Sequence, residues 1–208
     1  IFSAAVFIFV AVPVAVRAQT ALPTTFHTHH DHIPNFAQNP TIRTKQNGAW
    51  SAASTWDAGR VPAASDIVLI SHVVTYDSTS GDADVIGITS PGALRFSTTQ
   101  NTRLRVGTLL VMPQGKLEVG TASAPVPANI TAEIIIKNKS LNVAIDPDQY
   151  GTGILSVDGT VTMHGAVKAP TFARVTRVPR AGDTNFSLEV PVNGWRVGAH
   201  SRAVVSQR

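Results

Sequence analysis

The sequence predicts an all-β protein, and within that class a right-handed parallel β-helix with about 23 residues per coil. Three observations favour this architecture: a repeat in the middle of the chain, short runs of alternating apolar residues, and glycines at the bends between those runs. The composition agrees, because 43% of the residues are hydrophobic, 14% are charged, and 15 glycines and 13 prolines are typical of one domain rich in strands and turns.

The repeat appears when residues 86–96 are aligned with residues 109–119, at an offset of about 23 residues. Two further steps of the same offset fall on residues 132–134 and residues 155–157. We therefore expect the matching apolar side chains to stack in inward-facing columns. The predicted columns are Ile88, Val111, Ile134 and Val157, and Leu94 with Leu117.

Each repeating unit contains two short strands joined by a bend that carries a glycine, where a positive φ angle is easily adopted. One unit cannot bury its small apolar face alone, so stacking of successive units is expected. At about 3.3 Å per residue, one unit suits one turn of a narrow, prism-shaped β-helix. A leucine-rich repeat would need an asparagine ladder, which is absent, and an antiparallel sandwich would not keep a constant offset.

Residues 1–18, "IFSAAVFIFVAVPVAVRA", form an apolar run that ends in a small residue and does not begin with methionine. This pattern predicts a signal peptide truncated at its start, with cleavage after Ala18. A membrane anchor is the alternative, but Pro13 interrupts the run, which is shorter than the roughly 20 residues that a bilayer requires. We expect an exported protein, secreted or at the cell surface, with no membrane span after signal removal.

Residues 19–46 are predicted to be a flexible linker rich in histidine. Neutral imidazoles so close together are candidate ligands for zinc, copper or nickel. The spacing matches no fixed metal-site pattern, however, so we predict incidental affinity rather than a built metal site, and we expect no cofactor. The candidate ligands are His27, His29, His30 and His32.

Two of the three tryptophans, Trp50 and Trp56, come directly before the first clear strand, "IVLI" at residues 67–70. A stack of coils has an open end with unpaired backbone groups, which needs a cap. We predict that the two indoles form this cap, with Asp66 fixing the entry of the strand. The alternative is that the indoles form a stacking platform for a sugar ring.

The stretch "GAWSAASTWDAGRVPAASDIVLI" resembles the opening signature of the G8 domain, a glycine-rich module. The similarity continues through "GALRF", "GKLEVGT", "ILSVDGTVTMHG" and "GWRVGAH". The sequence departs from the family pattern at Ser65, where a glycine is usual, and at Gly198-Ala199, where a Gly-Asp pair is usual. The second departure removes an acidic residue and weakens any role of that position.

The resemblance implies a β-helical extracellular module, as found in fibrocystin-like proteins, in hyaluronan-processing proteins and in bacterial secreted proteins. We assign the module to residues 47–199 and expect residues 200–208 to begin a truncated downstream region. Further domains of a longer chain are therefore expected partners. The hyaluronan-processing members are much longer chains, so the resemblance does not by itself imply an enzyme.

No nucleophile elbow, zinc-protease motif or phosphate loop is present, and the chain has no cysteine. Asp158 and His164 flank the fourth repeat, where they could approach each other across a bend, and they are candidates for general acid and base catalysis. Asp158 precedes a glycine, however, and an Asp-Gly pair is typical of a turn. We therefore predict no catalytic residues within this chain.

The basic residues are concentrated near the C-terminus, where residues 167–208 hold 7 basic and 2 acidic side chains. The planar guanidinium group matches carboxylate and sulfate groups, so we expect this region to contact an anionic polysaccharide, and we expect no nucleic-acid partner. A polysaccharide-depolymerising enzyme fragment and a protein-adhesion scaffold remain alternatives. The predicted ligand-binding residues are Arg174, Arg177, Arg180 and Arg196.

Overall fold

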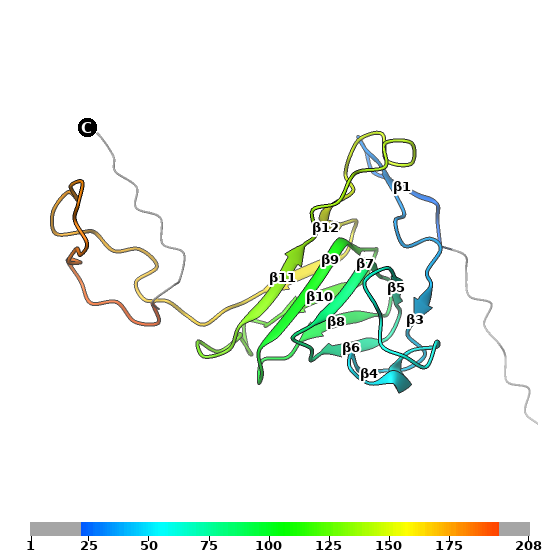
Figure 1. Cartoon of the computed structure of the whole chain (residues 1–208), viewed down its shortest axis with the longest axis horizontal. Coiled ribbons are helices and arrows are strands. Elements are labelled where there is room, and N and C mark those ends of the chain that lie inside the picture. The colour runs from blue at the N-terminus through cyan, green and yellow to red at the C-terminus, as the bar shows by residue number, and fades with distance from the viewer. Residues whose placement is uncertain (1–21, 196–208) are drawn as a thin grey trace, which may run out of the picture.

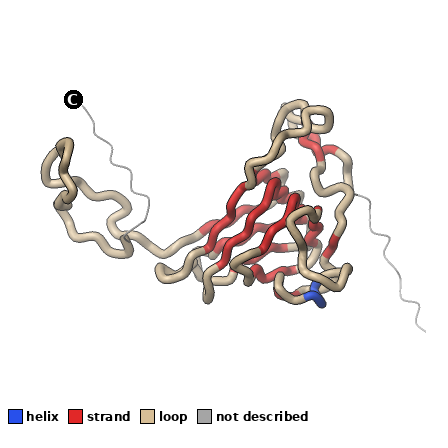
Figure 2. Tube along the Cα trace, viewed as in Figure 1, coloured by secondary structure: helices blue, strands red, loops and turns tan. Residues whose placement is uncertain are grey.

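The computed structural model describes residues 22–195, and these residues are built from strands and loops, with one short 3-10 helix, η1 (Ala53–Thr55). Figures 1 and 2 show strands stacked side by side in one body, from which the C-terminal part of the chain extends. The predicted all-β class is confirmed. The predicted signal peptide, residues 1–18, and the predicted downstream region, residues 200–208, lie outside the described residues.

Successive strands of the body alternate between two sheets, except that β11 and β12 both belong to the first sheet, and every strand pair within these sheets is parallel. Parallel pairing of successive turns of the chain agrees with the stacking that the repeat predicts. The first sheet contains β3 (Ile42–Arg43), β5 (Ile67–Ile70), β7 (Gly81–Ile88), β9 (Thr102–Val111) and β11 (Ala132–Ile136), with β12 (Gly153–Ser156) also paired to β9. The second sheet contains β4 (Gly48–Ala49), β6 (Val73–Tyr76), β8 (Ala93–Phe96), β10 (Lys116–Val119) and β13 (Thr160–Met163).

The predicted offset is correct in the middle of the body. Ile88 pairs with Val111 between β7 and β9, and Leu94 pairs with Leu117 between β8 and β10. All four side chains are fully buried between the two sheets. The sequence therefore gave the correct register for these strands, because in parallel strands paired residues point to the same side.

The offset fails after β9, so the predicted column is correct only for Ile88 and Val111. Ile134 pairs with Leu104, and Val157 lies in a different apolar cluster. The reason is that β9 is ten residues long and pairs with β11 along its first half and with β12 along its second half. Residues 137–152 form a loop between β11 and β12. This loop changes the sequence offset between paired strands, although β12 still pairs in parallel with β9.

Glycines do occupy the bends, but the physical reason differs from the predicted one. Gly92 and Gly115 do not have positive φ angles. A Cβ atom at Gly92 would collide with the carbonyl oxygen of Ile70, and one at Gly115 would collide with that of Ile88. The bends need glycine because the chain passes against the backbone of the preceding turn.

Two apolar clusters lie on the two faces of the first sheet. The larger cluster fills the space between the sheets and includes Ile86 and Leu109. The smaller cluster lies on the outer face and includes Leu69 and Leu110, which are the sequence neighbours of inward-facing residues. Side chains alternate between the faces of a strand, so the first sheet is covered on both faces over this part.

The outer cluster is covered by an antiparallel hairpin of β1 (Thr25–His27) and β2 (His32–Pro34). Phe26 and Ile33 are paired across this hairpin, and both are buried in the outer cluster. Further along, β3 joins the first sheet through β5. The described part of the predicted linker is thus packed on the body. Its buried apolar residues, such as Phe26 and Ile33, lie between exposed histidines, so the sequence of this segment shows no long apolar run.

Candidate functional site

Residues 166–195, which we call the C-terminal arm, leave the body after β13 and extend away from the sheets (Figures 1 and 2). The arm doubles back on itself, because isolated bridges join Ala169 to Asn193 and Val175 to Leu188. The indole Nε1 of Trp195 donates a hydrogen bond to the carbonyl oxygen of Pro170 at 2.9 Å. These contacts hold the two sides of the arm together at its base and near its middle.

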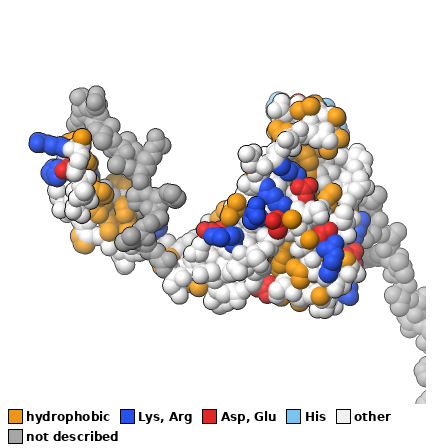
Figure 3. Space-filling model, viewed as in Figure 1, with side chains coloured by type: hydrophobic (Ala, Val, Ile, Leu, Met, Phe, Trp, Pro, Cys, Tyr) orange, Lys and Arg blue, Asp and Glu red, His pale blue; other side chains and the backbone are white. Residues whose placement is uncertain are grey.

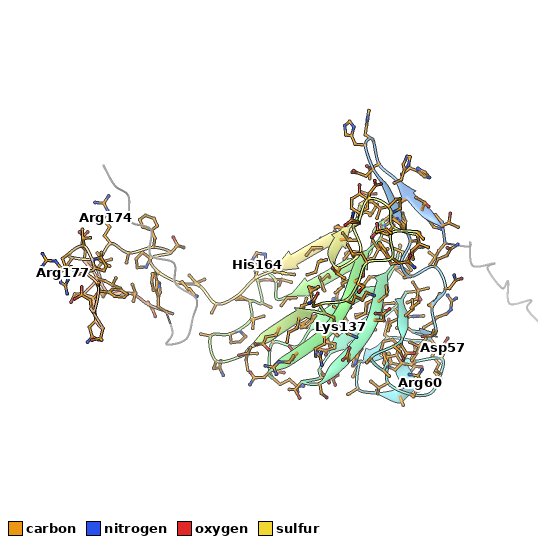
Figure 4. All side chains as sticks on the ribbon, turned by 45° about the horizontal axis from the view of Figure 1, so that its top comes forward. Asp57, Arg60, Lys137, His164, Arg174 and Arg177 are labelled. Atoms are coloured by element: carbon orange, nitrogen blue, oxygen red, sulfur yellow. The ribbon has the colours of Figure 1, made fainter. Side chains whose placement is uncertain are left out.

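Three of the predicted ligand-binding arginines lie exposed on this arm, at Arg174, Arg177 and Arg180. Figure 3 shows basic side chains at the far end of the arm, and Figure 4 shows Arg174 and Arg177 there, away from the sheets. The fourth, Arg196, lies outside the described residues. The structure therefore brings three of the four residues onto one projecting segment.

One of these arginines is paired within the arm. Arg177 Nη1 lies 2.7 Å from Asp183 Oδ2, and the same oxygen accepts a hydrogen bond from the backbone N–H of Arg180 at 2.7 Å. The Arg177 guanidinium lowers the pKa of Asp183. Among the described residues, no acidic side chain pairs with the guanidinium of Arg174 or Arg180. Both residues are exposed.

The tryptophans predicted as a cap lie inside the body. Trp50 and Trp56 are fully buried, with ring centroids 5.1 Å apart in an edge-to-face arrangement. Trp50 also lies 5.1 Å from Tyr76, which is followed by Phe96 at 4.7 Å, so four aromatic rings continue through successive turns of the chain. Because both indoles are enclosed, neither presents a face to a sugar ring. Their role as a cap stays a prediction.

Asp66 is held by a dense set of hydrogen bonds next to the start of β5. Arg60 contacts both carboxylate oxygens, at 2.6 and 2.9 Å. The backbone N–H of Ala63 and the hydroxyl of Thr41 also donate to this carboxylate, at 2.7 and 2.8 Å. The hydrogen bonds from Arg60 are the main reason that the pKa of Asp66 is well below its usual range. This geometry agrees with a structural role at the entry of the strand.

The four candidate metal ligands lie exposed on the hairpin. His27 and His32 face each other across β1 and β2 with ring centroids 4.7 Å apart, and His29 and His30 are 4.8 Å apart at its turn. Asp31 accepts a hydrogen bond from the hydroxyl of Tyr150 at 2.7 Å, which lowers the pKa of Asp31. Within residues 22–195, no group of three or more His, Cys, Asp or Glu side chains is arranged to hold a metal ion.

Asp158 and His164 are not brought together. They lie just before and just after β13, so the length of that strand separates them. Asp158 has a φ angle of 53°, and its carbonyl oxygen accepts a hydrogen bond from Gln114, as expected of a turn residue. His164 lines a cavity of about 460 Å³ with mainly apolar neighbours, including Met163 and Val126. The structure offers no acid and base pair at these positions.

A ladder of charges that was not predicted from the sequence lies on the outer face of the first sheet. Lys137 Nζ lies 2.6 Å from Asp82, and Lys139 Nζ lies 2.8 Å from Asp84. Arg105 adds a longer contact of 3.8 Å to Asp82. Figure 3 shows basic and acidic side chains intermixed on the visible face of the body. The signal was present as like charges two residues apart in three consecutive strand regions: Asp82 and Asp84, Arg103 and Arg105, Lys137 and Lys139.

The comparison with protein families gives one match, in which residues 55–176 match the G8 domain model. This range covers more than half of the chain and includes β5 to β13. No solved structure matches the chain. No helix within residues 22–195 is both long and apolar enough to cross a membrane.

Three curated proteins are similar to most of the chain. Fibrocystin of Canis lupus familiaris is 29% identical over 162 residues, which is 76% of this chain and 4% of that protein. Fibrocystin of Mus musculus is 28% identical over 152 residues, which is 72% of this chain and 4% of that protein. Fibrocystin-L of Mus musculus is 26% identical over 154 residues, or 72% of this chain and 3% of that protein. The chain thus spans a small part of the length of these relatives.

Proposed function

The chain belongs to the G8 domain family, and from this premise we propose that it is an exported, β-helical binding module of a larger protein and that its ligand is an anionic polysaccharide. The β-helix is supported by two parallel sheets that receive the strands from β3 to β11 in alternation. The role as a module is supported by similarity to a small part of much longer relatives.

The observation that carries the polysaccharide proposal is the contrast between the charges of the arm and those on the outer face of the first sheet. On that face, acidic and basic side chains are paired in a ladder, as Lys137 with Asp82 and Lys139 with Asp84. On the arm, Arg174 and Arg180 are exposed and have no acidic partner among the described residues. A guanidinium group that is already solvated and unpaired can bind a carboxylate or sulfate group without breaking an internal ion pair.

Catalysis is the less favoured function, because Asp158 and His164 lie at opposite ends of β13. A protein-adhesion scaffold is the remaining alternative, and it would contact other proteins along the sheets without a preference for charged polymers. The two non-catalytic functions differ in the ligand that they predict, so one binding experiment separates them.

The experiment measures binding of the full chain to hyaluronan or alginate, and to dextran as the neutral polymer. We expect binding to the anionic polymer only, with a steep decrease between low and physiological salt as exposed charges are screened. The combined substitution Arg174→Gln, Arg177→Gln and Arg180→Gln should weaken this binding and leave the melting temperature unchanged.

The matched control is Arg43→Gln, Arg95→Gln and Arg105→Gln, which removes the same charge from exposed positions of the body. This control should retain binding, since it leaves the arm intact. Equal binding of dextran and hyaluronan, or equal loss in both triple variants, would exclude the arm as a specific polysaccharide site and leave the adhesion scaffold.

A further inference from the structure

The last turn of the chain in the body, formed by β11, β12 and β13, has inward-facing positions that follow from the register. Each residue in this turn that pairs with a buried residue of β9 or β10 must point to the same side as its partner. The pairs are Leu104 with Ile134, Val106 with Ile136, Leu109 with Ile154, Leu117 with Val161, and Val119 with Met163. All five partners in the last turn are therefore core-type positions, and all five are apolar.

Four of these five core-type positions are nevertheless exposed, and the fifth, Ile134, is only partly buried. Leu109 and Leu117 are fully buried, whereas Ile154 is 37% exposed and Val161 is 38% exposed. Met163 reaches 50%, although its partner Val119 is only 9% exposed. The side chains in each pair have the same orientation and the same chemistry. They differ only because nothing in the described chain covers the last turn.

The opposite end of the stack shows how this protein finishes an end that faces solvent. There, Ile42 is fully buried, and the indoles of Trp50 and Trp56 are fully buried with it. The chain thus encloses the apolar column at its first turn and leaves the column open at its last turn. An end adapted to water would carry polar residues at the inward positions, as expected where a stack of repeats terminates.

Backbone groups are available at the same end. β11 and β13 are the outermost strands of their sheets, and each has a strand neighbour on one side only among the described residues. The cavity beside His164 opens here as well, and Val119, Val126 and Met163 line it. The surface therefore presents an unpaired strand edge of each sheet and an apolar column between the two edges. Each earlier turn of the chain presents the same combination of strand edges and apolar column to the turn that follows it.

We propose that this surface, the open end, binds a further parallel β-coil of another polypeptide segment, with apolar residues at alternating inward positions. The inference rests on the proposed role as a module of a larger chain and names the kind of segment that the module contacts. Continuity of the internal stacking identifies the occupant: only a coil in parallel register extends both sheets and also covers Ile154, Val161 and Met163. A small apolar ligand would leave the strand edges unpaired.

The test uses a fluorescently labelled peptide with the sequence of residues 102–119 as the probe. These residues form β9, the bend and β10, and in the structure they already pair with β11, β12 and β13 from the other side. We expect the full chain to bind this peptide saturably in a fluorescence anisotropy titration. Binding should also slow hydrogen exchange at the amides of β13.

Two variants separate a register-specific contact from general adhesion. Val161→Asp places a charge in the column and should weaken peptide binding by at least about tenfold. Thr160→Asp adds the same charge to the same strand at a position that does not face the column, and it should retain binding. Since both residues are exposed, both variants should fold, which circular dichroism and the melting temperature will verify.

Three results would overturn the proposal. The first is absence of saturable binding by a folded, monomeric chain, or equal loss of binding in both variants. The second is self-association of the chain through Val161, which would make a second copy the occupant. The third is binding that appears only when residues 167–208 are deleted, which would make the arm the occupant. The triple arginine variant should bind the peptide normally, so failure of the polysaccharide experiment is distinguishable from failure here.

Discussion

The stacked sheets and the C-terminal arm differ in the burial of their apolar side chains. In the sheets, the inward residues of successive turns form columns in which Val111, Leu94 and their neighbours are fully buried. In the arm, Phe172, Val178 and Phe186 are all exposed. The backbone of the sheets is paired strand by strand, whereas isolated bridges join the two sides of the arm.

This difference indicates that the sheets provide most of the stability of the domain, whereas side chains on the arm can be substituted with little effect on stability. Burial of apolar area stabilises the sheets in proportion to the area removed from water, so their sequence is constrained at every buried inward position. The arm contributes little burial, so its side chains can be selected for contact with other molecules. Substitutions should therefore destabilise the sheets and leave the stability of the arm mutants nearly unchanged.

The largest effect is expected for Val111→Asp. This side chain is fully buried in the column between the sheets, and an unpaired charge there costs several kcal/mol, so the domain should unfold. Circular dichroism and thermal melting measure the outcome. The matched variant Val178→Asp on the arm should melt as the parent chain does, and a folded Val111→Asp protein with an unchanged melting temperature would contradict the inward column.

A smaller but substantial effect is expected for Trp56→Ala. The indole is enclosed by Trp50 and donates a hydrogen bond from its Nε1 to the carbonyl oxygen of Trp50 at 2.9 Å. Its removal should lower the free energy of unfolding by about 3 to 5 kcal/mol, as for other large truncations in a core. Chemical denaturation measures this value, and polysaccharide binding by the folded fraction should be retained. Lost binding with unchanged stability would instead indicate a ligand-binding indole.

An intermediate, pH-dependent effect is expected for Asp66→Asn. The depressed pKa of Asp66 means that its stabilisation is fully present above the unfolded-state pKa of about 3.9 and is lost as the pH falls through the lower folded-state pKa. At neutral pH the variant should lose about 1 to 3 kcal/mol, as expected for hydrogen bonds to a charged group. Denaturation curves at several pH values should show the difference from the parent shrinking below about pH 4, in the range of that unfolded-state pKa. A difference independent of pH would exclude this explanation.

The smallest effect is expected for Asp183→Asn, which removes the ion pair between Asp183 and Arg177 on the arm. An ion pair of exposed groups contributes little in water, so the melting temperature should stay that of the parent chain. Binding of hyaluronan should be retained or strengthened, because Arg177 loses a competing carboxylate. A clear decrease in melting temperature would show that the arm contributes to stability and would remove the contrast with the sheets.

Several features of the fold and the site were predictable from residues alone. The alternation of apolar residues and the offset between residues 86–96 and residues 109–119 predicted parallel stacking in the correct register. The burial of Trp50 and Trp56 favours the predicted structural role of the indoles over the alternative of a sugar-stacking platform. The charge ladder was not predicted, because Lys137 and Lys139 follow β11, where the repeat offset no longer holds.

By itself, the sequence determined the all-β class, the inward and outward faces of the central strands, and the concentration of arginines near the C-terminus. These properties are local, because the side-chain period of a strand and the composition of a segment do not depend on distant contacts. Tertiary structure alone decided that Phe26 and Ile33 bury on the outer face, that β9 carries both β11 and β12, and that the arm projects from the body. Each of these depends on which separated segments pack together, and the length of an intervening loop such as residues 137–152 does not specify that choice.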